Sequence, residues 1–409
     1  MSTTPVPTAP QSGDDTEEKP KLDVRQQIRR IVQGDLSSVR VILGLVVIAL
    51  IFQVQESRFL SAQNLTNLML QITTIGLISV GIVYVLLLGE IDLSVGAVSG
   101  LGGAVMVVLN VKHGWNPYLA IAAAVATGAA IGCAQGFLFS RFVVPSFVVT
   151  LAGLLTWQGA LLQVLGQTGS LNVTDPKITG LANIFYSNTT GWIIAVVCIV
   201  AYGLVLGIGY RRRVAAGLGD SNPLPQIFRF VVIAAIVIGA VAIFNASRGV
   251  PLAVLILLGF VIGMEYVVQT TTFGRHVFAV GGSDEAARRA GIRVNGVRVA
   301  VFTISGSMAA VGGVMAASRL FAVNQNSGGN ELLLLAIAGP VIAGTSLFGG
   351  RGSVWTALLG ALVIGSISNG MDLLGLASPI KYMVTGGVLL LAVLVDAVAK
   401  QQRQTRGRA

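Results

Sequence analysis

Charged residues are scarce in this chain of 409 residues, since only 11% of them are Asp, Glu, Lys or Arg. A soluble domain carries charge on roughly a quarter of its residues, so this composition excludes an ordinary soluble fold. Apolar residues make up 54% of the sequence, and the mean hydropathy is +0.80. The chain is therefore expected to lie in a lipid bilayer, where only helices or closed barrels satisfy every backbone group.

Residues for metal binding and covalent chemistry are also few. The two cysteines, Cys133 and Cys198, fall within apolar runs, and the two histidines, His113 and His276, are far apart in sequence. This arrangement supports neither a disulfide framework nor a metal site. No Walker-type phosphate loop, nucleophile elbow or zinc-protease motif occurs. We therefore expect no enzyme and no cofactor, and any energy for uphill transport enters through a partner.

Long apolar runs predict about twelve membrane-spanning helices. Runs such as VILGLVVIALIF and VVIAAIVIGAVAIF reach, with their flanks, the roughly 20 residues that cross a hydrocarbon core. They lack the alternation of barrel strands, so the predicted fold is an all-α polytopic membrane protein. The expected spans are 41–54, 68–88, 95–111, 118–139, 145–165, 191–210, 230–247, 250–270, 299–318, 332–348, 354–370 and 380–397.

Basic residues predict the orientation. The net charge is +10, but Lys and Arg are scattered between the apolar runs, which does not favour a nucleic-acid surface. Because Lys and Arg collect on the cytoplasmic side of membrane proteins, both termini are expected there. Residues 1–38 form a tail, expected to be disordered, that is not a cleavable signal peptide. Residues 39–398 form the transmembrane domain, and 399–409 a basic tail. The expected cytoplasmic loops hold Arg141, Arg211, Arg212, Arg213, Arg229, Arg275, Arg288, Arg289, Arg293, Arg298 and Arg351.

The stretch GGSDEAARRAGIRV, residues 281–294, is charge-dense and lies in the expected cytoplasmic loop 271–298. It predicts a short helix with a serine cap, acidic residues in its first turn, basic residues in its last turn and a closing glycine. Three alanines leave a face of low bulk, which suits a docking helix, although a surface helix that touches nothing fits equally well. The predicted docking residues are Ser283, Asp284, Glu285, Ala286, Ala287, Arg288, Arg289 and Gly291, with Ala290 on the same face.

The stretch GEIDLSVG, residues 89–96, places two carboxylates between two apolar runs. Ionisable groups at membrane depth are costly and indicate function, and a broken helix beside a pathway is a common device in transporters. Glu90, Asp92, Ser94 and Gly96 are therefore candidate pathway residues, with Asp92 or Ser94 capping the next helix. The other interpretation is a solvated turn at the inner membrane interface.

Other polar residues within the spans are weaker candidates. Glu265 either lines the pathway or pairs with Arg275, and the pairing is favoured because Glu265 lies within two turns of the expected boundary. Four uncharged side chains are expected either to bind a hydroxylated solute or to join helices to one another, and for each of them the second interpretation is favoured: Gln135, Thr150, Gln158 and Asn369. A weak similarity also relates 89–100 to 348–360, as an internal repeat or by chance.

Four motifs carry a resemblance to a known family: EIDLSVG (90–96), VPSFVVTLAG (144–153), GGSDEAARRAGIRV (281–294) and GTSLFGGRGSV (344–354). Together they resemble the permease subunits of bacterial ABC sugar importers of the ribose, galactose and xylose group, with the xylose branch the most similar. The resemblance implies a ten-helix core plus an extra pair, in the bacterial inner membrane. It also implies a second permease copy, an external sugar-binding protein and a cytoplasmic ATPase that docks on the segment matching 281–294.

Two other classes of function remain open from the residues alone. One is a secondary carrier driven by an ion gradient, with Glu90, Asp92 and Glu265 as its coupling groups. The other is a membrane scaffold or enzyme without a transport role. The resemblance favours the sugar permease over both.

Overall fold

The computed structural model describes residues 36–142, 144–217, 223–388, 390–391 and 394. Most of the predicted N-terminal tail and all of the predicted C-terminal tail lie outside these residues. The helices are α2 (Leu36–Gln55), α3 (Ala62–Leu87), α4 (Val95–Val107) with a π-helical turn (Val108–Lys112), α5 (Pro117–Phe142), α6 (Ser146–Leu165) with a 3-10 turn (Gly166–Thr168), α7 (Pro176–Asn183), α8 (Asn188–Ala215), α9 (Leu224–Asn245), α10 (Leu252–Thr270), α11 (Thr272–Gly282), α12 (Asp284–Arg289), α13 (Val294–Leu320), α14 (Asn330–Ile342) and α15 (Trp355–Leu373).

Helices long and apolar enough to cross a membrane dominate the part of the chain that the structure describes. There are nine of them: α3, α4 with its π-helical turn, α5, α6, α8, α9, α10, α13 and α15. The expected spans at 41–54 and 332–348 correspond to shorter apolar helices, Val41–Gln55 and Asn330–Ile342. The last expected span, 380–397, lies partly outside the described residues. The all-α polytopic fold is confirmed, whereas the count of twelve stays a prediction.

Helix α14 ends before the predicted span does. The prediction extended it to 348, but it stops at Ile342, two residues after an internal proline, Pro340. Proline removes a helical hydrogen bond, and the chain that follows includes glycines in the left-handed region, such as Gly344 with φ 107° and Gly349 with φ 80°. Residues 343–354 therefore form a loop, and α15 starts a new helix.

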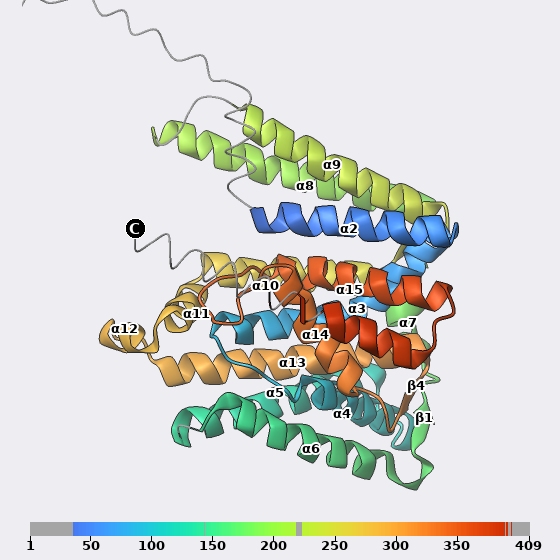
Figure 1. Cartoon of the computed structure of the whole chain (residues 1–409), viewed down its shortest axis with the longest axis vertical. Coiled ribbons are helices and arrows are strands. Elements are labelled where there is room, and N and C mark those ends of the chain that lie inside the picture. The colour runs from blue at the N-terminus through green and yellow to red at the C-terminus, as the bar shows by residue number, and fades with distance from the viewer. Residues whose placement is uncertain (1–35, 143, 218–222, 389, 392–393, 395–409) are drawn as a thin grey trace, which may run out of the picture.

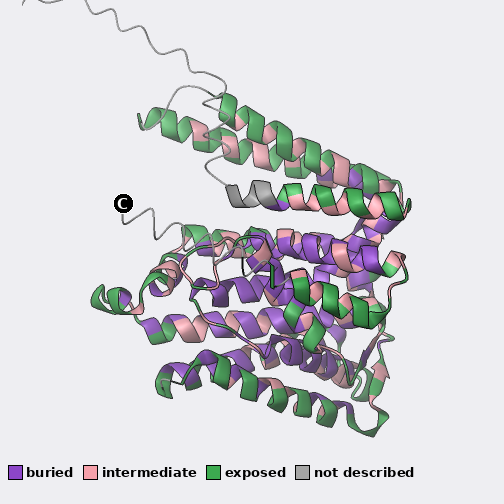
Figure 2. Cartoon of the chain, viewed as in Figure 1, coloured by how far each residue is buried: buried purple, intermediate pink, exposed green. Residues whose placement is uncertain are grey.

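The centre of the bundle is formed by α13 and α3. Helix α13 packs against α5, α3 and α4, and α3 is buried along most of its length (Figures 1 and 2). Glycines bring α13 and α5 together closely: a Cβ on Gly128 would lie 2.2 Å from the carbonyl oxygen of Gly306, and one on Gly132 would lie 2.0 Å from that of Phe302. Such close backbone packing is typical of helices in membranes.

The outer helices expose apolar side chains. Helices α8 and α9 pack against each other at one edge, and α6 lies at the opposite edge (Figure 1). Their surfaces are largely exposed (Figure 2), with Ile193 and Val205 on α8 at 57% and 68% exposure. In a bilayer these faces contact lipid without cost, so their exposure agrees with a membrane location.

The long connection 166–190 is ordered by one short helix and two strand pairs. It contains α7, which Asp175 caps by accepting the backbone N–H of Lys177 at 2.8 Å. Ile178 of α7 is fully buried. Two short antiparallel strand pairs attach the connection to distant segments: β1 (Ser170–Asn172) with β4 (Ala322–Asn324), and β2 (Phe185–Tyr186) with β3 (Val250–Pro251).

The helix ends that carry basic residues lie at one end of the bundle. The C-terminal ends of α5 and α8, which hold Arg141 and the run Arg211–Arg213, are at the same end as α12, and α2 begins there (Figure 1). This grouping agrees with the predicted orientation, in which that end faces the cytoplasm. The location of both termini stays a prediction.

Candidate functional site

Helix α12 forms as the sequence predicts. The Ser283 hydroxyl accepts the backbone N–H of Ala286 at 3.3 Å. At the other end Gly291 adopts φ 81°, its N–H bonds the Arg288 carbonyl, and the N–H of Ile292 bonds the Ala287 carbonyl, both at 3.0 Å. These two bonds make a Schellman motif, which closes the helix.

The exposed face of α12 includes fewer of its alanines than predicted. The helix projects at one end of the bundle (Figure 1), and Glu285 pairs with Arg289 at 2.5 Å while both side chains stay more than 70% exposed. Ala286 and Ala290 are exposed, but Ala287 is only 3% exposed and packs in the core of the bundle. The expectation that all three alanines share one open face is therefore wrong for Ala287, because a one-residue step turns it toward the bundle.

Arg298, in the second turn of α13, joins α12 to the segment between α3 and α4. Its Nη2 forms an ion pair with Asp284 Oδ2, with an N···O distance of 2.7 Å, and donates a hydrogen bond to Glu90 Oε1 at 3.1 Å. The guanidinium also lies 5.5 Å from the ring centre of Phe139 on α5. The sequence marks Arg298 only as one of the basic residues in the expected cytoplasmic loops. Its partners are 14 and 208 positions away, so spacing gave no indication of this role.

The segment 88–94 interrupts the helix as predicted, and Asp92 organises it. Asp92 is 2% exposed. Its Oδ1 accepts the backbone N–H of Ser94 at 2.9 Å and the Ser94 hydroxyl at 2.7 Å, while Oδ2 accepts the Ser305 hydroxyl of α13 at 3.0 Å. Asp92 thus binds the backbone N–H of Ser94, the residue directly before α4, whereas the Ser94 side chain makes no capping bond to the helix. Ser305 was missed by the sequence analysis because no motif marks it.

The partners of Glu90 and Asp92 on α13 show that the segment turns back into the bundle. Glu90 contacts Arg298, whereas Asp92 contacts Ser305, seven residues further along the same helix. Seven residues correspond to about 10 Å along a helix. The solvated-turn interpretation is therefore wrong for Asp92, while Glu90, with its side chain 19% exposed, stays near the end of the bundle.

The four uncharged polar candidates within the spans lie in different environments: two contact the interrupted segment, one joins two helices and one is exposed. Gln135 Oε1 lies 3.0 Å from the Ser94 hydroxyl, and the Thr150 hydroxyl lies 3.4 Å from the Ile91 carbonyl, so α5 and α6 hold the interrupted segment from outside. Asn369 accepts a hydrogen bond from Asn64 at 2.8 Å, which joins α15 to α3. Gln158 is exposed on α6.

Glu265 does not pair with Arg275, contrary to the favoured prediction. It accepts the Ser353 hydroxyl at 2.9 Å and the backbone N–H of Val354 at 2.7 Å, directly before α15 begins. A carboxylate at the start of a helix accepts hydrogen bonds from free backbone N–H groups and is stabilised by the positive end of the helix dipole. Arg275 instead reaches the carbonyl of Thr270.

The two segments with weak sequence similarity meet in space. The N–H of Gly350 bonds the Leu87 carbonyl at 2.9 Å, and Gly89 lies against the backbone of Phe348 and Gly349. Gly281 closes the contact, since a Cβ there would lie 1.8 Å from the Leu87 carbonyl oxygen and 2.8 Å from the Gly350 nitrogen. The end of α11 thus touches both loops through backbone atoms alone.

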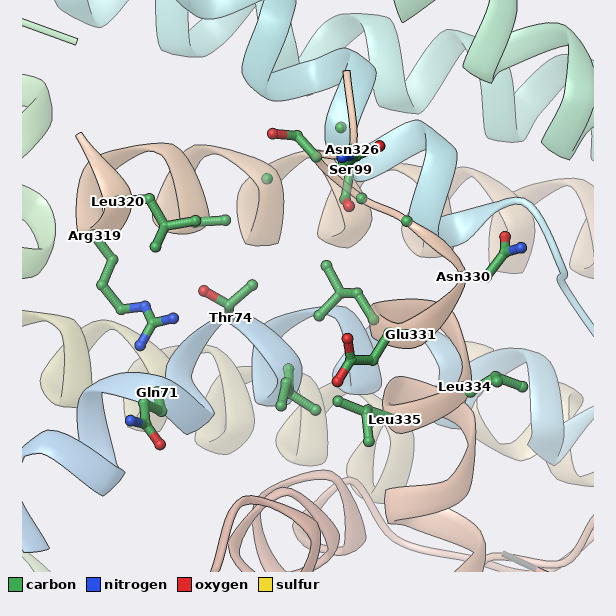
Figure 3. Close-up of a pocket in the computed structure, with 18 of the residues that line it drawn as sticks. Gln71, Thr74, Ser99, Arg319, Leu320, Asn326, Asn330, Glu331, Leu334 and Leu335 are labelled. Atoms are coloured by element: carbon green, nitrogen blue, oxygen red, sulfur yellow. The ribbon is translucent and has the colours of Figure 1, made fainter. Parts of the chain in front are cut away.

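A cavity of about 970 Å³ lies toward the opposite end of α13. Arg319 and Glu331 point into it from α13 and α14, and α3 contributes Gln71 and Thr74 (Figure 3). Arg319 Nε is buried without a hydrogen-bond partner among the described residues. None of Gln135, Thr150, Gln158 and Asn369 lines this cavity.

The three carboxylates of the carrier hypothesis do not form one site. Glu90 is ion-paired, Asp92 is held by two serines and Glu265 caps α15. Glu90 and Asp92 contact α13 at positions seven residues apart, whereas Glu265 contacts the start of α15. This arrangement gives no support to an ion-coupled carrier.

Comparisons with known proteins agree with the motifs. A family model described as the branched-chain amino acid transport system permease component matches residues 64–393. The xylose transport system permease protein XylH of Escherichia coli K12 is 38% identical over 85% of this chain and 88% of its own length. XylH of Haemophilus influenzae is 35% identical over 88% and 96% of the two chains.

A ribose import permease is also similar. RbsC of Bacillus subtilis is 32% identical over 91% of this chain and 96% of its own length. No solved structure matches the chain significantly. The relatives confirm the resemblance to bacterial sugar permeases, the expectation of a transport subunit rather than an enzyme, and a multi-pass location in the bacterial inner membrane. The chain therefore belongs to this family of transport-system permease components.

Proposed function

We propose that this permease carries a pentose such as D-xylose into the cell, with ATP hydrolysis supplied by a separate cytoplasmic ATPase. The relatives support the substrate, because xylose permeases of two organisms exceed the ribose permease of Bacillus subtilis in identity. Sugars that differ by one hydroxyl are separated by a few hydrogen bonds. Xylose is therefore the first sugar to test, with ribose as its competitor.

The observation that carries the proposal is the form of α12. It is capped at both ends, projects from the bundle and exposes an ion pair and two small alanines, so a partner can approach its backbone closely. We assign this face to the ATPase. Ser283 and Gly291 fix the ends of the helix, Ala287 anchors it, and the exposed charges select the partner.

The cavity is the proposed route of the sugar. Its walls carry both donors and acceptors, including Arg319, Glu331 and Gln71, and a polyhydroxylated solute needs both. It lies toward the end of the bundle opposite α12, where an external sugar-binding protein would deliver its cargo. A second copy of the permease completes the proposed assembly, as the family resemblance implies.

Uptake of labelled D-xylose into proteoliposomes tests this function. The permease is reconstituted with its ATPase and binding protein, with ATP on the side of the ATPase. We expect uptake that requires ATP and is inhibited by unlabelled xylose more strongly than by ribose or galactose. Uptake that proceeds without ATP but stops when an ion gradient is collapsed would establish a secondary carrier instead.

Cysteine labelling tests the orientation on which the proposal depends. Cysteines are placed at 217 and 286 in a variant whose exposed native cysteines, Cys133 and Cys198, have been replaced. Both positions are exposed at the end of the bundle that we assign to the cytoplasm. We expect neither to react with an impermeant thiol reagent outside intact cells, and both to react after permeabilisation. Reaction at either site in intact cells would reverse the topology.

A further inference from the structure

The contacts of Arg298 connect the proposed docking helix to the interrupted segment. Its Nη2 forms an ion pair with Asp284 Oδ2 on α12, with an N···O distance of 2.7 Å, and donates a hydrogen bond to Glu90 Oε1 before α4 at 3.1 Å. The Arg298 side chain is only 20% exposed, and Phe139 lies beside its guanidinium. The Asp284 side chain is 39% exposed and that of Glu90 is 19% exposed, so the contact between Arg298 and Glu90 is the more shielded of the two.

We propose that Arg298 is a positioning residue that transmits the movement of α12 to the segment 88–94, and through α4 to the wall of the cavity. The inference rests on the proposed function, in which the ATPase moves α12. Asp284 fixes α12 to the first turns of α13 through Arg298. Glu90 attaches that unit to the interrupted segment.

The path from segment 88–94 to the cavity consists of tight backbone contacts. Asp92 holds the start of α4 through Ser94. Further along α4, a Cβ on Gly96 would lie 2.7 Å from the carbonyl oxygen of Gly328, and one on Gly100 would lie 2.1 Å from that of Ser327. Gly100, Ser327 and Gly328 all line the cavity. Close-packed backbone does not absorb a displacement, so a shift of segment 88–94 moves this wall.

The positive charge of Arg298 is needed to hold the carboxylates of Asp284 and Glu90 near each other. The cluster contains one positive and two negative groups, and without the guanidinium the carboxylates of Asp284 and Glu90 face each other. Like charges at short range repel, so the side chains of Asp284 and Glu90 would no longer hold α12 to the segment 88–94. Lysine carries its charge at a single point and lacks the planar fork of arginine. Arg298→Lys is therefore expected to be intermediate between wild type and Arg298→Gln.

A second contact, close to backbone atoms, holds the preceding helix α11 against the end of α3. Gly281, at the end of α11, lies against Leu87 and Gly350. This contact remains when Arg298 is changed, so α12 keeps its place at the end of the bundle. A variant of Arg298 is therefore expected to bind the ATPase normally but to lose the transmission of α12 movement to the segment 88–94. A purely structural role of Arg298 would not predict this combination.

The test measures sugar transported per ATP hydrolysed in proteoliposomes, together with co-purification of the ATPase. We expect Arg298→Gln to lower the transport ratio about 10-fold, within the usual range of coupling between sites, while co-purification is unchanged. Glu90→Gln, which keeps the ion pair between Arg298 and Asp284, is expected to lower the ratio about 5-fold, at the low end of that range. Arg141→Gln is the control, since it removes an exposed positive charge at the end of α5, and it should match wild type.

Several results would overturn the inference. Wild-type ratios in both Arg298→Gln and Glu90→Gln would do so, as would a loss of co-purification in Glu90→Gln, which would assign the cluster to folding. If Arg298→Gln does not reach the membrane, Glu90→Gln decides alone. Failure of the proposed function is visible separately, because the wild-type protein would then show no ATP-dependent sugar uptake.

Discussion

Two arginines of the same polar region, Arg289 and Arg298, are used in opposite ways. Arg289 pairs with Glu285 on its own helix, and both side chains remain mostly in solvent. Arg298 is largely shielded and bonds carboxylates from two other elements. Exposed pairs contribute little to stability because water and salt screen them. The region therefore has an outward part, free to bind a partner, and an inward part that attaches it to the bundle.

Removing the carboxylate of Asp92 should have the largest effect on the inward part. Asp92→Ala leaves the N–H of Ser94 and the Ser305 hydroxyl without their acceptor in a buried place. We expect a loss of about 2–4 kcal/mol in the free energy of unfolding, and loss of uptake. Asp92→Asn keeps one oxygen acceptor and should lose less. Thermal unfolding in detergent measures both, and equal stability of Asp92→Ala and wild type would remove Asp92 from the site.

Two neighbouring glycines at the end of α11 differ in the same way. A Cβ on Gly281 would overlap the Leu87 carbonyl, whereas one on Gly282 meets nothing within 4 Å. Gly281→Ala is expected to destabilise the protein by about 1–3 kcal/mol and to reduce uptake. Gly282→Ala should be neutral or slightly stabilising, because alanine favours a helix. Equal melting temperatures for the two variants would show that the contact between α11 and the loops is not tight.

Two adjacent alanines of α12 distinguish the attachment of the helix to the bundle from its docking on the ATPase. Ala287 is buried, so Ala287→Trp is expected to cost about 1–2 kcal/mol of stability by overpacking. Ala286 is exposed, so Ala286→Trp should leave unfolding unchanged but reduce co-purification of the ATPase. If Ala286→Trp co-purifies as wild type does and Ala287→Trp unfolds as wild type does, the assignment of the two faces is wrong.

The exposed ion pair should show the smallest change in stability. Glu285→Gln removes its pairing with Arg289, and such pairs on a helix contribute about 0.2–0.5 kcal/mol. The melting temperature is therefore expected to stay within error of wild type. Glu285→Arg, which also reverses a charge in the partner surface, should weaken ATPase co-purification at low salt. Co-purification that is independent of this charge would leave α12 without an electrostatic role in docking.

Local patterns predicted local structure well. The caps of α12 and the break at 89–96 follow from Ser283, Gly291 and the polar run, because these signals act within a few residues. The contacts of Arg298, Ser305 and Glu265 were not predictable, since their partners lie far away in sequence and depend on how the helices pack. Ala287 and α14 were predicted incorrectly for a related reason. Composition shows that a residue is small or apolar, but not which face the bundle covers or where a loop turns back.

Photo-crosslinking from position 286 shows whether the outward face of α12 is where the ATPase docks. A photoreactive amino acid replaces Ala286 on α12 or, as a control, Ile193 on the lipid-facing side of α8. After illumination of membranes that contain the complete transporter, we expect a covalent product with the ATPase from position 286 and none from position 193. Absence of the product from 286, in membranes where ATP-dependent uptake is intact, would contradict the assignment of α12 as the docking helix.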